Sequence, residues 1–162
     1  MKPTIRCMSC GKALNSIREN HRYVESGLPN VTLVNVEVRR CPHCGEQELV
    51  IPKIEQLHRV LAEAVSKKTE RLSHQETRFL RKYLGWSGAD FAAHFGVAPE
   101  TVSRWESGNQ AMNPMAEKLL RVLALHLEPI NDYSILKSWS SGKPVNCNYR
   151  LEWTDSWEAV AA

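Results

Sequence analysis

Residues 87–108 of this chain carry the pattern that most limits its fold: two short helical segments joined by a tight turn. Ser87 and Asp90 have the spacing of a capping box, and Gly96 is placed to end the helix that they begin. Pro99 suits the first turn of a second helix, which Gly108 would end. The pattern therefore predicts two capped helices in close succession.

Similar signals lie on both sides of this pair. Ser73 and Glu76 form a second capping box, at the start of a helix predicted over Ser73–Tyr83. A last helix is predicted to begin at Asn113-Pro114 and to end by Pro129. Its broad apolar face consists of Met115, Leu119, Leu120, Leu123 and Leu127. Four short capped helices predict a compact all-α unit over residues 71–129.

The helix that Pro99 begins has one apolar and one polar face. Val102 and Trp105 are three residues apart and are expected to pack inward on Leu84, Phe91 and Phe95. The outward positions are polar: Glu100, Thr101, Ser103, Arg104 and Ser107. Glu106 is expected to form an ion pair with a basic residue of the first helix, Arg81.

A short helix with this polar face suits the major groove of DNA, which is wide enough to admit an α-helix. Arg104 can bond guanine in bidentate fashion, and Glu100, one turn earlier, can accept from cytosine. Glu100 has an alternative role as a first-turn acid that favours the helix dipole. The other candidate contacts to bases or phosphates are Thr101, Ser103, Ser87, Ser107 and Asn109.

Four of the five cysteines form two Cys-x-x-Cys-Gly motifs, Cys7/Cys10 and Cys41/Cys44. Two such turns can place four thiolates around one ion, and tetrahedral thiolate coordination favours zinc over an iron–sulfur cluster. Four protein ligands leave no open position, so the expected Zn²⁺ is structural. His43 is an alternative ligand in a mixed site, and no ligand role is predicted for Cys147.

The cysteine pairs flank a segment that predicts β-structure. Val31–Arg39 is rich in β-branched residues, and its alternation places Thr32, Val34, Val36 and Val38 on one side. Residues 23–25 are the expected partner strand of a hairpin. Residues 1–50 hold seven basic and five acidic side chains, an excess that four thiolates and one Zn²⁺ would cancel. This unit is therefore expected to hold a partner protein rather than to make the main DNA contact.

The complete domain prediction is an α+β chain. It comprises a β-rich zinc-binding unit over residues 1–51, a helical linker over 52–70, the helical unit over 71–129, and an extension over 130–162. Apolar residues repeat at helical spacing between Lys53 and Glu70. In the extension, Tyr149–Trp153 predicts a strand, and the tryptophans, Trp139 among them, are expected to pack on the core. The alternative is that they form a partner surface.

Bulk properties exclude several classes of protein. The net charge is only +3, so DNA binding would depend on local placement of charge and on a second copy of the chain. No apolar run of about 18 residues predicts a membrane span, and no secretion signal is predicted, so we expect a cytoplasmic protein. Two further classes are not favoured by the motifs. A metal-dependent hydrolase would need an open metal position, which four cysteine ligands do not leave. An RNA-binding ribbon would need basic and aromatic residues interleaved on the Cys-x-x-Cys-Gly motifs, where few occur.

Residues 87–108 resemble the helix-turn-helix of XRE-type (Cro/repressor-like) regulators, whose motif Gly-Val-x-Pro-x-Thr-Val-Ser-Arg-Trp-Glu-x-Gly is matched almost throughout by residues 96–108. With the two cysteine motifs ahead of it, the chain resembles the MqsA-type antitoxins over residues 5–128, which join a YgiT-type zinc finger to such a domain. Two positions depart from that pattern: Glu100 replaces an Asn that reads bases, and Gly88 replaces a Gln.

The resemblance implies a λ-repressor-like helical domain that dimerises and reads a palindromic operator near its own promoter. It also implies that Cys7, Cys10, Cys41 and Cys44 bind the metal and that Arg104 reads a base. The chain is thus expected to be a non-enzymatic repressor and the antitoxin of a type II toxin–antitoxin system, neutralising a small toxin. The alternative is a free-standing or phage-borne regulator without a toxin partner.

Overall fold

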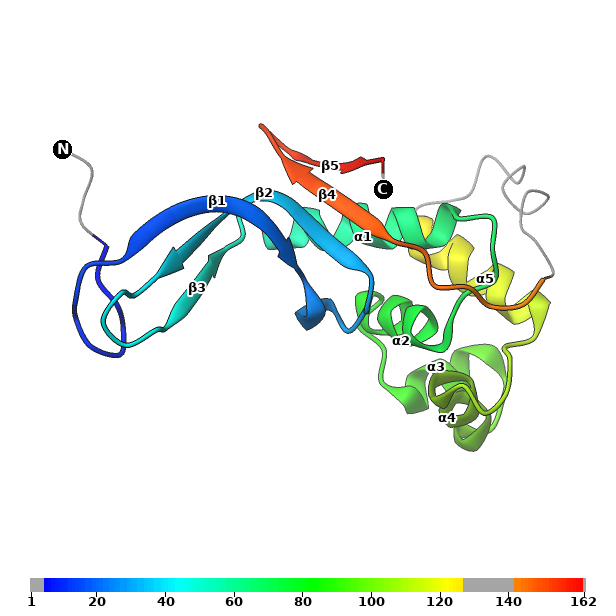
Figure 1. Ribbon diagram of the computed structural model, residues 1–162. Coiled ribbons are helices and arrows are strands. Elements are labelled where there is room, and N and C mark those ends of the chain that lie inside the picture. Colours follow the sequence, from blue (N-terminus) through cyan, green and yellow to red (C-terminus); the bar gives the residue numbers. More distant parts are fainter. Residues whose placement is uncertain (1–4, 127–141, 162) are drawn as a thin grey trace.

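The computed structural model describes residues 5–126 and 142–161. It contains a mixed sheet and, within those residues, five α-helices, so the predicted α+β class is confirmed (Figure 1). The strands are β1 (Asn15–Arg22), β2 (Val31–Arg40), β3 (Gln47–Val50), β4 (Tyr149–Trp153) and β5 (Trp157–Val160). The helices are α1 (Ile54–Lys67), α2 (His74–Tyr83), α3 (Gly88–Phe95), α4 (Pro99–Ser107) and α5 (Pro114–Leu125).

Strand β2 organises the sheet. Its whole length pairs with β1 in antiparallel fashion. On its other side, the end near the second cysteine pair contacts β3, and the beginning of the strand pairs in parallel with β4. Strand β5 then adds to β4. Two strands from the far end of the chain therefore complete a sheet that the N-terminal residues begin.

The predicted alternation along β2 is wrong because the strand contains a bulge. Asn35 has a positive φ of 55°, and its amide donates to the side-chain oxygen of Asn20 at 3.1 Å. The bulge lets Leu33 and Val36 face the same side, where both are buried. Thr32 and Val34 therefore lie on the opposite face to Val36 and Val38.

The predicted hairpin partner is also wrong. Residues Val24–Ser26 form one turn of 3₁₀ helix, and the partner strand is β1. Most side chains of β1 are exposed and polar, so its sequence lacks the apolar alternation that marks a half-buried strand. Tyr23 is nevertheless buried, and its ring stacks on that of His58 in α1.

Helix α1 lies in the predicted linker and covers one face of the sheet. Leu57, Leu61 and Val65 are fully buried on it, and its neighbours are α2, α5, β4 and β5. The indole N–H of Trp157 in β5 donates to the carbonyl of Pro52, just before the helix. The described part of the extension therefore packs on the core, as one of the two sequence-based alternatives proposed.

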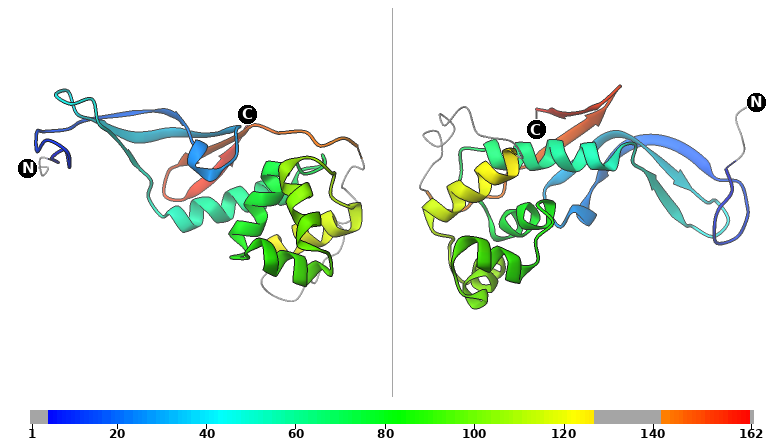
Figure 2. Two further views of the ribbon diagram at one scale, coloured as in Figure 1. Left: turned by 90° about the horizontal axis from the view of Figure 1, so that it is seen from below. Right: turned by 180° about the vertical axis from the view of Figure 1, so that it is seen from behind.

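Helices α2 to α5 occupy the end of the molecule away from the cysteine pairs (Figures 1 and 2). Both predicted capping boxes are present: Ser73 with Glu76, and Ser87 with Asp90. Asn113 caps α5, whose Leu120 is buried whereas Met115 is 73% exposed. The expected helix end at Pro129, together with Leu127 and Trp139, lies outside the described residues.

A buried polar network ties the helical unit to the C-terminal extension. Lys68 is in contact with Glu76 at 2.7 Å and also donates to the carbonyl of Val145. Deeper in the helical unit, the fully buried Arg121 bonds Glu117, which also pairs with Arg71. Buried charges of this kind are tolerated because each has a hydrogen-bonded partner of opposite sign.

Candidate metal centre and nucleic-acid interface

The two cysteine motifs adopt matching turns. The amide of Gly11 donates to the carbonyl of Cys7 at 2.8 Å, and the amide of Gly45 donates to that of Cys41 at 3.0 Å. Both glycines have positive φ, 70° and 78°, a conformation that costs glycine little. Each turn directs the sulfurs of its two cysteines to one side.

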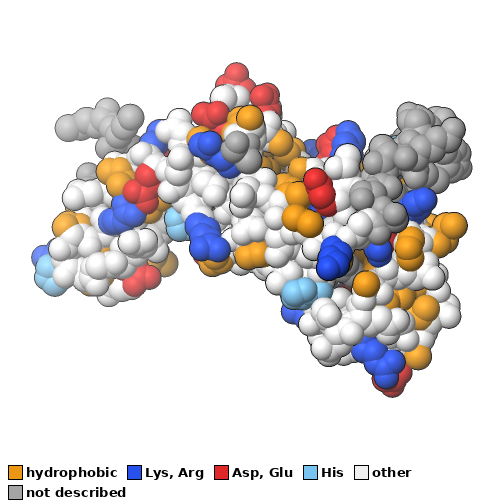
Figure 3. Space-filling model, turned by 45° about the vertical axis from the view of Figure 1, so that its right-hand side comes forward, with side chains coloured by type: hydrophobic (Ala, Val, Ile, Leu, Met, Phe, Trp, Pro, Cys, Tyr) orange, Lys and Arg blue, Asp and Glu red, His pale blue; other side chains and the backbone are white. Residues whose placement is uncertain are grey.

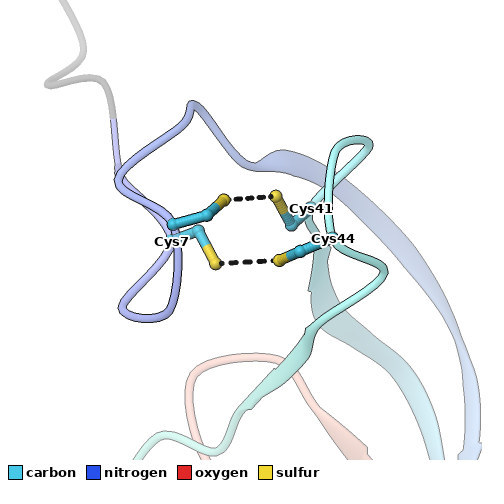
Figure 4. Close-up of side chains that lie close together, drawn as sticks. Cys7, Cys41 and Cys44 are labelled. Atoms are coloured by element: carbon cyan, nitrogen blue, oxygen red, sulfur yellow. Dashed lines mark hydrogen bonds between the residues drawn. The ribbon is translucent and has the colours of Figure 1, made fainter.

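The two turns bring all four sulfurs together. The Sγ atoms of Cys7, Cys10, Cys41 and Cys44 lie within 4.8 Å of one another (Figure 4). The Cys7–Cys44 pair is 3.6 Å apart and the Cys10–Cys41 pair 3.4 Å. Zn–S bonds of about 2.3 Å in a tetrahedron require sulfurs about 3.8 Å apart. All four cysteines are free of disulfides, so the cluster could hold a metal ion and its geometry fits Zn²⁺.

The backbone of the second turn favours a thiolate. Hydrogen bonds from the backbone of Cys44 and His43 lower the pKa of Cys41 to about 6. A hydrogen bond from the backbone of Glu46 also lowers the pKa of Cys44. Hydrogen bonds with the Cys41 and Cys7 side chains outweigh this effect and raise the pKa of Cys44 to about 12. Without a cation, the Cys41 and Cys44 thiols therefore do not ionise together near neutral pH, whereas a bound divalent ion would stabilise both thiolates.

Only cysteines supply this centre among the described residues. His43 is exposed and is not a member of the four-residue cluster. Cys7 and Cys41 are buried, and Cys44 is exposed. The centre therefore lies at the surface, at the tip of the sheet and far from α4 (Figures 1 and 2).

Helices α3 and α4 pack through aromatic side chains, as the sequence predicts. The ring of Phe91 lies 6.0 Å from that of Trp105 and 4.6 Å from that of Phe95. Trp86 completes the group beside Phe91. Val102 and Trp105 are buried, so the opposite side of α4 faces solvent.

The predicted DNA contacts form that solvent-facing side and its surroundings. Thr101 is half-buried, and the remaining candidates are exposed: Ser87, Glu100, Ser103, Arg104, Ser107 and Asn109. In the part of the chain that the structure describes, Arg104 and Glu100 have no ion pair. A basic and an acidic side chain project together from this tip of the molecule (Figure 3). The arrangement leaves Arg104 able to reach a ligand.

Glu106 fixes α4 against α2. Both of its carboxylate oxygens accept from Arg81, one of them at 3.0 Å, so the predicted ion pair is present. Arg78 adds a second contact, at 3.3 Å to the carboxylate and 2.9 Å to the Glu106 carbonyl. Sequence reasoning missed Arg78, although its position one turn before Arg81 places it on the same face of α2.

The sequence model for the antitoxin component of bacterial toxin–antitoxin systems, MqsA, matches residues 5–133. The chain belongs to this family. Neither the curated proteins nor the solved structures that were searched contain a match to it. None of the described helices is long and apolar enough to cross a membrane. Strands β4 and β5 lie outside the matched residues.

Proposed function

We propose that this protein is the antitoxin of a type II toxin–antitoxin system and a repressor that binds the promoter of its own operon. Family membership supports an antitoxin. The observation that carries DNA binding is the free polar face of α4, where Arg104 is exposed and without an ion pair among the described residues. Helices α2–α5 would form a λ-repressor-like helix-turn-helix domain over residues 71–129, with α4 in the major groove.

In that pose, Arg104 and Glu100 read bases, and Thr101 and Ser103 contact bases or the backbone. Ser87, Ser107 and Asn109 lie where they can approach phosphates. The Glu106–Arg81 pair would hold α4 in place, so the polar face needs no rearrangement on binding. This preorganisation supports DNA binding by the exposed face of α4.

We propose that two copies join through an apolar groove beside α4. The groove measures about 430 Å³ and is lined by Phe95, Val97, Met115 and Leu119 among others. Met115 is 73% exposed and Leu119 44%, which is costly for side chains of this size unless they are covered. A two-fold contact of this patch with itself would place two α4 helices on the half-sites of a palindromic operator.

The zinc-binding unit, residues 1–51, is the proposed toxin-binding part, with one structural Zn²⁺ held by Cys7, Cys10, Cys41 and Cys44. The distance between the cysteine cluster and α4 supports this division, since one end can hold a protein while the other holds DNA. The linker comprises residues 52–70 and the extension residues 130–162. We expect a cytoplasmic protein without catalytic activity.

Co-expression with the product of the adjacent gene tests the antitoxin assignment. A small protein that arrests growth alone, and that is neutralised by and co-purifies with this chain, is the expected result. A neighbour that neither arrests growth nor binds would favour the free-standing or phage-borne regulator, for which the exposed face of α4 is equally suitable.

A further inference from the structure

A polar pocket of about 400 Å³ lies on the sheet near the beginning of β2. The cysteine cluster lies near the other end of that strand. The pocket is lined by Arg22, Pro29, Asn30, Thr32, Asn148 and Arg150. These residues lie at the end of β1, in and just before the beginning of β2, and in and just before the beginning of β4. Neither the metal centre nor the polar face of α4 includes any of them.

The strand register explains why three of these side chains meet. Arg22 is paired with Thr32 across the antiparallel β1–β2 ladder, and Thr32 is paired with Arg150 across the parallel β2–β4 ladder. Paired residues on neighbouring strands point to the same face of a sheet. Leu33 and Leu151, the next residues along, are fully buried. The row Arg22–Thr32–Arg150 therefore lies on the face opposite α1.

Neither arginine of this row forms an ion pair with a residue that the structure describes. Arg22 donates through Nε and Nη2 to the carbonyl of Pro29, at 3.0 and 2.7 Å, which orients its guanidinium and leaves Nη1 available. Arg150 is half-buried, and its side chain forms no hydrogen bond or ion pair with any residue in 5–126 or 142–161. Glu152 follows on the same face of β4, but it does not pair with either arginine.

Arg22 and Arg150 lie on either side of Thr32 in this row, and an anion bound between them would offset their mutual repulsion. Apart from Pro29, the groups around the pocket can all donate hydrogen bonds: two guanidinium groups, a hydroxyl and the amides of Asn30 and Asn148. Donors arranged around an open space suit an oxyanion with several acceptor oxygens, and arginine forks match phosphate in particular.

We propose that this pocket binds a phosphate group, presented either as free phosphate or by the backbone of DNA. Asn148 and Arg150 lie beyond the residues that match the family. The C-terminal extension thus supplies two of the six lining residues, and β1, β2 and the turn before β2 supply the other four. Binding there would add to the stability of the β2–β4 pairing.

The test uses the full-length, zinc-loaded protein and two probes. Calorimetric titration with inorganic phosphate measures the affinity for the free anion. Fluorescence anisotropy with a short DNA duplex of arbitrary sequence measures the affinity for the DNA backbone, over a series of salt concentrations. The variants are Arg150→Gln, Arg150→Lys and Thr32→Val. Arg59→Gln is the matched control, because Arg59 is exposed on α1 and has no ion pair in the described part of the chain. Circular dichroism verifies that each variant is folded.

If free phosphate is the ligand, Arg150→Gln weakens its binding at least about tenfold, Arg150→Lys retains part of it, and Arg59→Gln leaves it unchanged. If the DNA backbone is the ligand, Arg150→Gln lowers the salt dependence of DNA binding by about one phosphate contact and Arg59→Gln does not. The proposal is wrong if folded Arg150→Gln behaves as wild type with both probes. The phosphate titration needs no DNA, so its result is independent of the repressor proposal.

Discussion

The phenolic hydroxyl of Tyr149 donates a hydrogen bond to Oε1 of Glu76, joining the first residue of β4 to the first turn of α2. Glu76 is 2% exposed, and its other oxygen accepts from the Ser73 amide at 2.7 Å and contacts Lys68. One carboxylate therefore completes a capping box, neutralises a lysine and anchors the C-terminal extension.

Tyr149→Phe should lower the free energy of unfolding by about 1–3 kcal/mol, because it leaves one oxygen of a buried carboxylate without its donor. Chemical denaturation measures this change. Tyr83→Phe is the matched control: Tyr83 is half-buried on α2 and its hydroxyl has no hydrogen bond to a described residue, so its removal should have little effect. Equal losses in both variants would remove any special role for the Glu76 contact.

Cys41→Ser should abolish metal binding, because three thiolates and a hydroxyl no longer form a tetrahedral sulfur site. Elemental analysis is expected to find about one Zn²⁺ per chain in the wild type and almost none in this variant. Cys147→Ser should retain the metal, since Cys147 lies outside the cluster. The same Cys41→Ser protein should still bind DNA; loss of DNA binding without loss of the helical fold would contradict the division into two functional ends.

Met115→Glu combined with Leu119→Glu should convert the proposed dimer to monomers, because it places charges in the apolar groove beside α4. Sedimentation velocity measures the mass, and circular dichroism should show an unchanged helix content. Lys82→Glu, an exposed change on α2, serves as the control. A double variant that remains dimeric would assign the interface to another surface.

His58 should make stability depend on pH. Burial lowers the pKa of His58, which lies 3.0 Å from the Tyr23 hydroxyl. The unfolded chain then binds a proton more readily than the folded chain, so stability falls as the pH drops below about 6.5 and continues to fall until the lowered pKa is reached. In His58→Gln the slope of unfolding free energy against pH in this window should decrease. An unchanged slope in His58→Gln, measured with zinc kept saturating, would contradict this role of His58.

Local patterns predicted most of the helical part of this protein. Capping boxes and helix-ending glycines depend on residues a few positions apart, and the Cys-x-x-Cys-Gly turns are equally local. Local patterns did not predict which strands pair or which side chains of β2 are buried. The bulge at Asn35 shifts the buried set of β2, and the exposed strand β1 lacks an apolar period. No local signal indicates that Arg150 pairs with Thr32, because that register is fixed by long-range packing of Leu151 and Trp157 on α1.

The most direct test of the proposed function is the affinity of Arg104→Ala for DNA from the promoter of its own operon, measured by fluorescence anisotropy against the wild type. The account predicts a loss of about 1–3 kcal/mol of specific binding free energy, with zinc content, fold and binding to unrelated DNA nearly unchanged. Arg59→Ala should bind like the wild type. An Arg104→Ala protein with undiminished affinity for that promoter would contradict the assignment of α4 as the element that reads DNA.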